Sequence, residues 1–375
     1  MTDPSRSAST ARSMGPSVVL AGGGSAGHVS PLLAIAQAIR RAEPEARLRA
    51  VGTKDGLETR LVPAAGFELE LIDRVPMPRR PSLAALRFPV AMRRAIAQSR
   101  EILQRAEAEV LVGVGGYVCT PLYLAAQRLG IPTIIHEANL RPGLANRLGA
   151  RRAAAIGTAF EGIALPGAQW VGMPMRSDIA HADRAADRES ARAALGLPLD
   201  ATVLVVTGGS LGAVRINQAV AAAAADLVAA GIVVLHLTGA GKQVMDEHGE
   251  PLALPGYLQR EYLDTMALAY SAADLLVCRS GAGTVSEVAA VGVPAIFVPL
   301  PVGNGEQRLN AATLVDRDAA LMVADNEFSA DWLRRVALPL LRDPARLAEL
   351  GERAAQRGIR DAAEQMATMT LGAIR

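Results

Sequence analysis

The feature that most constrains the fold of this chain is a pattern that occurs in both halves of the sequence. A short run of aliphatic residues leads through a glycine turn into a helix-forming stretch, first as VVLAGGGSAG at 18–27 and again as VLVVTGGSLG at 203–212. Strand, glycine turn and helix in that order form the first unit of a parallel sheet with crossover helices. The repetition therefore predicts two lobes of the same α/β type.

The same alternation of strand-like runs with Ala- and Leu-rich helical stretches continues along the chain. It is typical of doubly wound sheets, which bind ligands at the carboxyl ends of their strands. We therefore expect two Rossmann-like lobes that face each other across a cleft. Strands are expected at 18–21, 48–51, 110–114, 133–136, 202–207, 232–237, 274–278, 295–298 and 321–323.

The chain has 375 residues, which is more than one ordinary hydrophobic core accommodates. We place the boundary between the lobes near Met173, with a first lobe at 15–173 and a second at 174–354. The helical stretch at about 355–375 is long enough to cross back and pack on the first lobe. Residues 1–14 are expected to form a disordered tail, which leaves the true start codon open.

Composition argues against several classes of protein. Half of the residues are hydrophobic and a fifth are charged, which is typical of a globular chain. A net charge of +2 gives no general basic field for nucleic acid. Cys119 and Cys278 lie far apart without partner ligands, so we expect neither a disulfide framework nor a zinc site, and a reducing cytosol fits. The sequence has no uninterrupted apolar run of about 18 residues that could span a membrane.

The first glycine turn has the spacing G-x-G-x-x-G at Gly22, Gly24 and Gly27. Such a turn brings backbone N–H groups and a helix N-terminus to a phosphate. A dinucleotide site would also need an acid at the end of the second strand, where this chain reads VGT at 51–53. NAD or FAD binding is therefore disfavoured, while a tight turn without a ligand remains an alternative.

The second glycine turn, GGSLG at 208–212, also fits the nucleophile elbow of a serine hydrolase. That enzyme needs a histidine late in the chain, but only His236 and His248 follow Ser210, and His236 lies inside an expected strand. We interpret Ser210 instead as a hydroxyl and backbone donor for an anion at a helix N-terminus.

The third glycine turn is CRSGAGTVSE at 278–287. Amides at Ala282 to Thr284 suit a phosphate or sugar oxygen, and the Glu287 carboxylate suits a diol such as ribose. A capped helix with a carboxylate in its first turn explains Glu287 as well. Three such turns in one chain favour a cleft for a nucleotide phosphate.

Metal chemistry finds little support in the sequence. The five histidines are scattered, and the Asp-x-Asp motif at Asp316 and Asp318 precedes an expected strand, which is the wrong end for a ligand site. We expect neither a metal nor another cofactor.

Seven ordered blocks together resemble the MurG family, the two-lobed (GT-B type) glycosyltransferases of peptidoglycan synthesis. They are GGGSAGHVSP at 22–31, GGY at 115–117, HEAN at 136–139, VGMPMR at 171–176, GGSLGA at 208–213, CRSGAGTVSE at 278–287 and EQRLNA at 306–311. The resemblance runs from about Val18 to the last helix. It implies an inverting transfer of N-acetylglucosamine (GlcNAc) from UDP-GlcNAc to the 4-hydroxyl of lipid-linked N-acetylmuramyl pentapeptide, lipid I to lipid II.

Position by position, the resemblance implies contacts from both lobes. In the first lobe, Ser25, Ala26 and Gly27 would face the donor sugar and diphosphate, and Asn139 the sugar. The second lobe would contribute Arg176 to the donor near the hinge, Ser210 to the α-phosphate, the Leu263 backbone to the uracil, Ala282, Gly283, Thr284, Val285 and Ser286 to the diphosphate and sugar, Glu287 to the ribose, and Gln307 to sugar hydroxyls. The family usually has Thr-Gly at Ser25–Ala26 and often paired glutamines at Glu306–Gln307, which leaves the role of Glu306 open.

His28, at the mouth of the first turn, is the candidate base for the acceptor hydroxyl because an imidazole titrates near neutral pH. The alternative is a histidine that only binds the acceptor pyrophosphate. Two other functions remain open: a UDP-sugar 2-epimerase of the same architecture, and a non-catalytic sugar-nucleotide- or lipid-binding protein. Product analysis separates these from a transferase.

A lipid-linked acceptor would bring the enzyme to the cytoplasmic face of the plasma membrane as a peripheral protein. Between Arg74 and Arg105 there are eight arginines and the single acid Glu101, interleaved with apolar residues. Basic residues beside an apolar face are typical of a segment that lies on an anionic membrane surface. The alternative is an ordinary amphipathic helix with solvated arginines.

Overall fold

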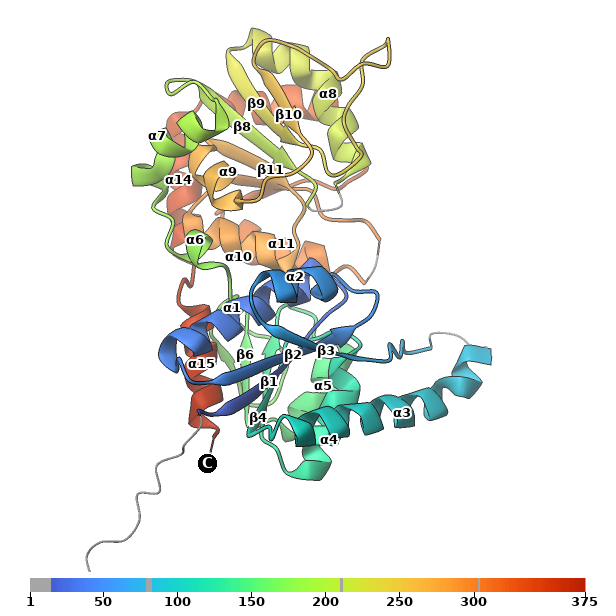
Figure 1. The fold of residues 1–375 in the computed structure, drawn as a ribbon. Coiled ribbons are helices and arrows are strands. Elements are labelled where there is room, and N and C mark those ends of the chain that lie inside the picture. Colours follow the sequence, from blue (N-terminus) through green and yellow to red (C-terminus); the bar gives the residue numbers. More distant parts are fainter. Residues whose placement is uncertain (1–14, 79–82, 210–211, 303, 375) are drawn as a thin grey trace, which may run out of the picture.

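The computed structural model describes residues 15–78, 83–209, 212–302 and 304–374, and Figure 1 shows two α/β lobes, one above the other. Each lobe contains one sheet, and every strand pairing in the two sheets is parallel. This confirms the predicted fold class. The tail predicted at 1–14 lies outside the described residues.

The first lobe has a seven-stranded sheet in the order β3-β2-β1-β4-β5-β6-β7. Its strands are β1 Ser17–Ala21, β2 Arg47–Thr53, β3 Glu68–Ile72, β4 Val110–Gly113, β5 Thr133–Glu137, β6 Ala155–Thr158 and β7 Ala168–Trp170. Its helices are α1 Ala26–Ala42, α2 Glu58–Ala64, α3 Leu83–Arg105, α4 Cys119–Leu129 and α5 Leu144–Gly149, followed by a 3-10 turn at Ala150–Arg152.

The second lobe has a six-stranded sheet in the order β10-β9-β8-β11-β12-β13. Its strands are β8 Thr202–Thr207, β9 Ile232–Leu237, β10 Tyr257–Arg260, β11 Leu275–Cys278, β12 Ala295–Phe297 and β13 Leu321–Met322. The helices from here to the C-terminus are α6 Ser177–Ala180, α7 Arg184–Leu195, α8 Val214–Ala229, α9 Met266–Ala272, α10 Ala282–Val291, α11 Glu306–Val315, α12 Ala330–Trp332, a π-helical turn Leu333–Ala337, α13 Leu338–Leu341, α14 Pro344–Ala355 and α15 Ala362–Gly372.

Helices cover both faces of each sheet, as the buried strand residues require. In β1, Val18 and Leu20 pack in one apolar cluster with residues of α1 and α15, while Val19 and Ala21 pack on the opposite face with residues of α3 and α4. Side chains alternate between the faces of a strand, so a strand that is apolar at every position needs cover on both sides. Because the strands are parallel, the glycine turns that follow them lie at the same edge of each sheet.

All nine predicted strands form, with ends within two residues of the expected positions. Four further strands were not predicted, namely β3, β6, β7 and β10. Three of these lie at the edges of the sheets. An edge strand is short or polar because only one neighbour orders it, so its hydrophobic pattern is weak.

The chain crosses between the lobes twice, and the two crossings touch each other. One follows β7, and the other joins α14 to α15. A Cβ atom at Gly172 would lie 2.6 Å from Cβ of Ile359, so only glycine allows this approach. Helix α15 then packs on α1 of the first lobe. The predicted boundary at Met173 falls beside this contact, and the limits given above for the lobes remain predictions.

Candidate active site

The first glycine turn leads from β1 into α1 and orients His28. Gly24 has a φ of +89°, a left-handed conformation that glycine adopts without strain. Ser25 precedes α1, and its carbonyl accepts the His28 N–H at 3.1 Å. The imidazole Nδ1 lies 3.1 Å from the Gly23 carbonyl and 3.3 Å from the Ser25 hydroxyl. Ala26 is the first residue of α1, and Gly27 follows it on the exposed start of the helix.

The Gly23 carbonyl determines which nitrogen of His28 carries the proton. Because a carbonyl only accepts, Nδ1 must donate, and neutral His28 keeps its lone pair on Nε2. A Cβ at Gly115, in the GGY block, would lie 3.1 Å from Nε2, so the ring edge faces this second loop. Burial lowers the pKa of His28, while the Gly23 hydrogen bond and the charges of Glu306 and Glu58 oppose that shift. His28 therefore has the tautomer with a free lone pair on Nε2, and burial favours the neutral form that can accept a proton there.

The third glycine turn presents a helix N-terminus without a side-chain cap, beside two serine hydroxyls that are not used. Gly281 precedes α10 and supplies no side-chain cap, and the buried hydroxyls of Ser280 and Ser286 have no hydrogen-bond partner among the described residues. The first N–H groups of a helix attract anions. Gln307 Oε1 accepts from the Ser280 N–H at 3.3 Å and from the Leu300 N–H at 3.0 Å, so Gln307 fixes the approach to this turn.

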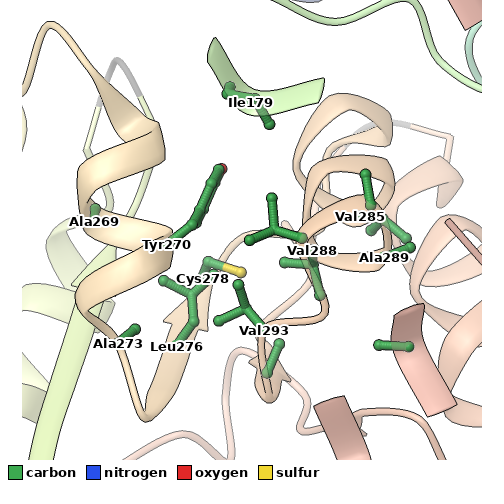
Figure 2. Close-up of a cluster of buried hydrophobic side chains, with 14 of the residues drawn as sticks. Ile179, Ala269, Tyr270, Ala273, Leu276, Cys278, Val285, Val288, Ala289 and Val293 are labelled. Carbon is green, nitrogen blue, oxygen red and sulfur yellow. The ribbon is translucent and has the colours of Figure 1, made fainter. Parts of the chain in front are cut away.

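Glu287 lies farther along α10 and hydrogen-bonds to Tyr270 of α9. The Tyr270 hydroxyl donates to Glu287 Oε2 at 2.6 Å. Figure 2 shows Tyr270 among the apolar side chains of α9, β11 and α10, with Ile179 of α6 nearby. Burial raises the pKa of Glu287 to about 7, the Asp178 charge adds to this rise, and the Tyr270 hydrogen bond and Arg176 oppose it. The carboxylate therefore gains from any further donor.

Arg176 and the loop that contains Leu263 meet beside Glu287. Arg176 donates to both carboxylate oxygens of Asp178, at 3.0 and 2.7 Å, and to the Asp264 carbonyl at 2.9 Å. Leu263 is partly buried against the core of the second lobe. The structure thus brings together three of the predicted donor residues, Arg176, Leu263 and Glu287, although they come from distant parts of the sequence.

Asn139 joins the two lobes. Its Oδ1 accepts from Asn310 Nδ2 at 3.3 Å, and Asn310 Oδ1 accepts the Leu140 N–H at 3.2 Å. The Asn139 N–H donates to the buried Glu137 at 2.9 Å. Because Asn310 follows Gln307 by one turn of α11, the structure brings Asn139 close to the helix that carries Gln307.

The predicted residues of α10 have different surroundings. Val285 and Ser286 line a cavity of about 230 Å³ between the lobes, together with Phe160 and Trp170 of the first lobe. Ala282 is buried, whereas Gly283 and Thr284 are partly exposed in the first turn of α10. Ser210 lies outside the described residues.

Sequence reasoning missed three residues of the site. Glu58 accepts the Gly24 N–H at 2.8 Å, Tyr270 binds Glu287, and Asn310 binds Asn139. Asn310 lies within the EQRLNA block, which was the only signal that pointed to it. The other two become visible only when the elements that carry them are packed together.

Metal ligands do not gather anywhere in the part of the chain that the structure describes. No group of three or more His, Cys, Asp or Glu side chains there could hold a metal ion. Asp316 and Asp318 follow α11, and Asp318 pairs with Arg346 and Arg353. Whether the reaction needs a metal remains a prediction from the sequence.

Two parallel-sheet lobes, with His28 of the first lobe near enough to feel the charge of Glu306 at the start of α11 in the second, are typical of the GT-B class of glycosyltransferases. Two family models match: the glycosyltransferase family 28 N-terminal domain at residues 18–158 and the C-terminal domain at residues 203–366. The chain belongs to glycosyltransferase family 28 and, within it, to the MurG family.

Curated relatives are similar over nearly the whole chain. A protein of Paenarthrobacter aurescens is 58% identical over 96% of this chain and 96% of its own length, and one of Mycolicibacterium smegmatis is 52% identical over 95% and 94%. Both are named UDP-N-acetylglucosamine–N-acetylmuramyl-(pentapeptide) pyrophosphoryl-undecaprenol N-acetylglucosamine transferase. The crystal structure of Acinetobacter baumannii MurG is similar with a TM-score of 0.78 and 27% identity, covering 95% of this chain and 99% of that one.

Proposed function

We propose that this protein transfers GlcNAc from UDP-GlcNAc to the 4-hydroxyl of undecaprenyl-pyrophosphoryl-N-acetylmuramyl pentapeptide, converting lipid I to lipid II in peptidoglycan synthesis. The observation that carries this proposal is the similarity to curated relatives with that printed activity, at 48 to 58% identity over nearly the whole chain. The residues of the candidate active site suit a nucleotide-sugar donor in the second lobe and a proton acceptor in the first.

His28 is proposed as the base of the reaction. The acceptor hydroxyl gives its proton to Nε2 as its oxygen bonds to the anomeric carbon, and the bond from that carbon to the UDP oxygen breaks. Attack from the face opposite UDP inverts an α-linked donor to a β-linked product. Nδ1 keeps its proton and continues to donate to the Gly23 carbonyl, which stabilises the imidazolium that forms.

The second lobe is proposed to hold UDP as donor and as leaving group. Developing charge on the diphosphate would be stabilised by the first N–H groups of α10, with Ser210, Ser25, Ala26 and Gly27 as further contacts. Glu287 would accept from the ribose hydroxyls, the backbone at Leu263 would meet the uracil, and Arg176 would contact the donor near the hinge. Gln307 and Asn139 would bind sugar hydroxyls. Gln307 has Nε2 available for this, because Oε1 already holds two backbone N–H groups.

The first lobe is proposed to bind the cytoplasmic face of the plasma membrane. Within the described ranges, no helix is both long and apolar enough to cross a bilayer. Helix α3 extends away from the body of the lobe in Figure 1, and its Leu86 and Val90 side chains are 76% and 69% exposed. They lie one turn apart beside the exposed Arg87. Exposed apolar side chains next to a basic one favour binding to an anionic membrane surface.

The proposed function is tested by UDP release from UDP-GlcNAc with and without the lipid-linked acceptor. We expect release only with the acceptor, together with a product heavier by one GlcNAc residue. An isomerised nucleotide sugar formed without acceptor would instead support the 2-epimerase, for which the curated relatives give no support. Binding of UDP-GlcNAc without any turnover would contradict both enzyme functions and support the non-catalytic binding protein.

A further inference from the structure

One peptide group connects a buried carboxylate to His28. The Gly24 N–H donates to Glu58 Oε2 at 2.8 Å, and the Gly23 carbonyl, on the other side of the same peptide group, accepts from His28 Nδ1 at 3.1 Å. A peptide group is planar, so the direction of its N–H fixes the direction of its carbonyl. A continuous hydrogen-bonded path therefore runs from Glu58 through the peptide to the imidazole.

Both carboxylate oxygens of Glu58 accept hydrogen bonds from the protein. Its side chain is 0% exposed, and its second oxygen, Oε1, accepts from the Thr53 N–H at 2.8 Å and from the Thr53 hydroxyl at 3.1 Å. Among the described residues no lysine or arginine pairs with it. Both oxygens are thus used by the protein, which excludes Glu58 as the acid that would bind a dinucleotide ribose at the end of β2.

Three glycines from three segments provide the space for this carboxylate. A Cβ at Gly23 would lie 2.3 Å from Glu58 Oε1, one at Gly52 2.3 Å from Cγ, and one at Gly56 1.9 Å from Oε2. No positive φ requires glycine at these positions, since Gly24 is the residue of the turn with that conformation. The glycines are needed because any side chain there would displace the carboxylate.

The orientation of the peptide between Gly23 and Gly24 must be fixed by a group outside the turn. Glycine adopts left- and right-handed conformations with similar ease, so two successive glycines do not determine which way the peptide between them points. A peptide rotated by half a turn would present its N–H to His28 and remove the acceptor that holds Nδ1. Only a strong acceptor on the far side, such as a buried carboxylate, keeps the carbonyl toward the imidazole.

We propose that Glu58 is a positioning residue that acts on His28 through the Gly23–Gly24 peptide, keeping the proton on Nδ1 and the lone pair on Nε2. The proposal rests on the proposed transferase function and on His28 as its base. The arrangement corresponds to the buried carboxylate that orients the histidine of a catalytic triad, with a peptide group inserted between them. The Glu58 charge also raises the pKa of His28, in the direction expected for a carboxylate that stabilises an imidazolium.

The test is Glu58→Gln, which keeps the shape of the side chain but places an NH₂ donor where an acceptor is needed. We expect kcat to fall by roughly ten- to a thousandfold, because the base is no longer held in one tautomer. The affinity for UDP should change by less than twofold. Glu109→Gln is the matched control, since Glu109 accepts the Ser17 N–H at 2.9 Å at the opposite end of β1, and it should keep the parental kcat.

A double-mutant cycle separates positioning from general damage to the fold. If Glu58 acts through His28, adding Glu58→Gln to His28→Ala should cause no further loss of kcat. A second loss as large as the first would overturn the proposal, and so would a Glu58→Gln variant with a kcat within twofold of the parent.

An NMR readout on ¹⁵N-histidine-labelled protein does not depend on turnover. In Glu58→Gln we expect the pKa of His28 to fall and the Nδ1–H signal to be lost, with neither change in Glu109→Gln. An unchanged Nδ1–H signal in Glu58→Gln would overturn the positioning role even if the parent showed no transfer to the lipid-linked acceptor. That absence of transfer would refute the proposed function instead.

Discussion

The two lobes use the same strand-turn-helix unit in opposite ways. In the first lobe, the protein itself binds the peptide between Gly23 and Gly24: Glu58 accepts the Gly24 N–H, and His28 Nδ1 donates to the Gly23 carbonyl. In the second lobe, α10 begins without a side-chain cap, and the buried Ser280 and Ser286 hydroxyls find no partner within the part of the chain that the structure describes. The Gly23–Gly24 peptide is thus held by internal hydrogen bonds, while the start of α10 keeps donors for an external anion.

This difference shows that a glycine turn does not by itself specify a phosphate site. What matters is whether a nearby side chain has already satisfied the backbone N–H groups. Glu58 does so for the Gly24 N–H in the first lobe, so this peptide is suited to orient a reacting group. The start of α10 lacks such a residue, so it is suited to hold a diphosphate. The comparison predicts that changes at Glu58 and His28 alter catalysis and that changes along α10 alter donor binding.

The largest expected effect is that of His28→Ala. It should lower kcat by roughly 10² to 10⁴ while leaving UDP affinity nearly intact, because the base is lost and the donor site is not. Steady-state kinetics and calorimetry with UDP measure the two quantities. The exposed His248, on a loop of the second lobe, provides the control His248→Ala. A loss seen mainly in the KM of the acceptor would reduce His28 to a binding residue.

Membrane binding should depend on arginines of the first lobe and not on those of the second. Reversing Arg79, Arg80 and Arg87 to Glu should weaken binding to anionic vesicles by about a hundredfold, since each arginine near anionic lipid contributes about 1 kcal/mol. Arg79 and Arg80 lie outside the described residues, and Arg87 is exposed on α3.

Vesicle sedimentation at increasing salt measures this effect. The same reversal at the exposed Arg335 and Arg342 of the second lobe should leave binding unchanged, and UDP affinity should not change in any variant. If the α3 variant sediments as well as the parent, this surface does not dock the enzyme.

Donor binding should depend on Glu287. Replacing it by Ala removes a charge-assisted hydrogen bond to the ribose, which should weaken UDP binding by roughly ten- to a hundredfold. Glu247→Ala, at an exposed site in the same lobe, is the control for loss of one negative charge. Calorimetry that gives the parental affinity for Glu287→Ala would show that the ribose is held elsewhere.

Most of the layered fold could be predicted because it depends on local patterns. The run TVLVVT at 202–207 is buried along nearly its whole length and forms β8 with the predicted ends. The run ELELI at 68–72 was missed because its alternating charges are tolerated only at the edge of a sheet, as β3 has β2 as its single neighbour.

The site could be predicted only where a motif carried it. Glu287 and His28 were found because each stands at a fixed distance from a glycine turn. Glu58 was missed because the sequence reads VGT where an acid was sought, and the carboxylate reaches that place only when α2 folds back against the turn. The contact between Asn139 and Asn310 joins residues from two lobes, so it follows from packing and not from spacing.

The smallest expected effect is the pH dependence of UDP affinity, which should come from Glu287 of the second lobe and not from His28 of the first. Burial raises the pKa of Glu287 to about 7, so the unliganded carboxyl is partly protonated at neutral pH. Ribose hydroxyls donate best to the ionised form, and binding below pH 7 must first release a proton. The affinity for UDP should therefore fall by about tenfold between pH 8 and pH 6, since a carboxyl of pKa 7 is mostly ionised at the first value and mostly protonated at the second. Calorimetry in Glu287→Gln should give weaker binding that no longer changes over this range, whereas His28→Ala should keep the parental pH dependence. A pH dependence that survives in Glu287→Gln would assign the titration to another group of the donor site.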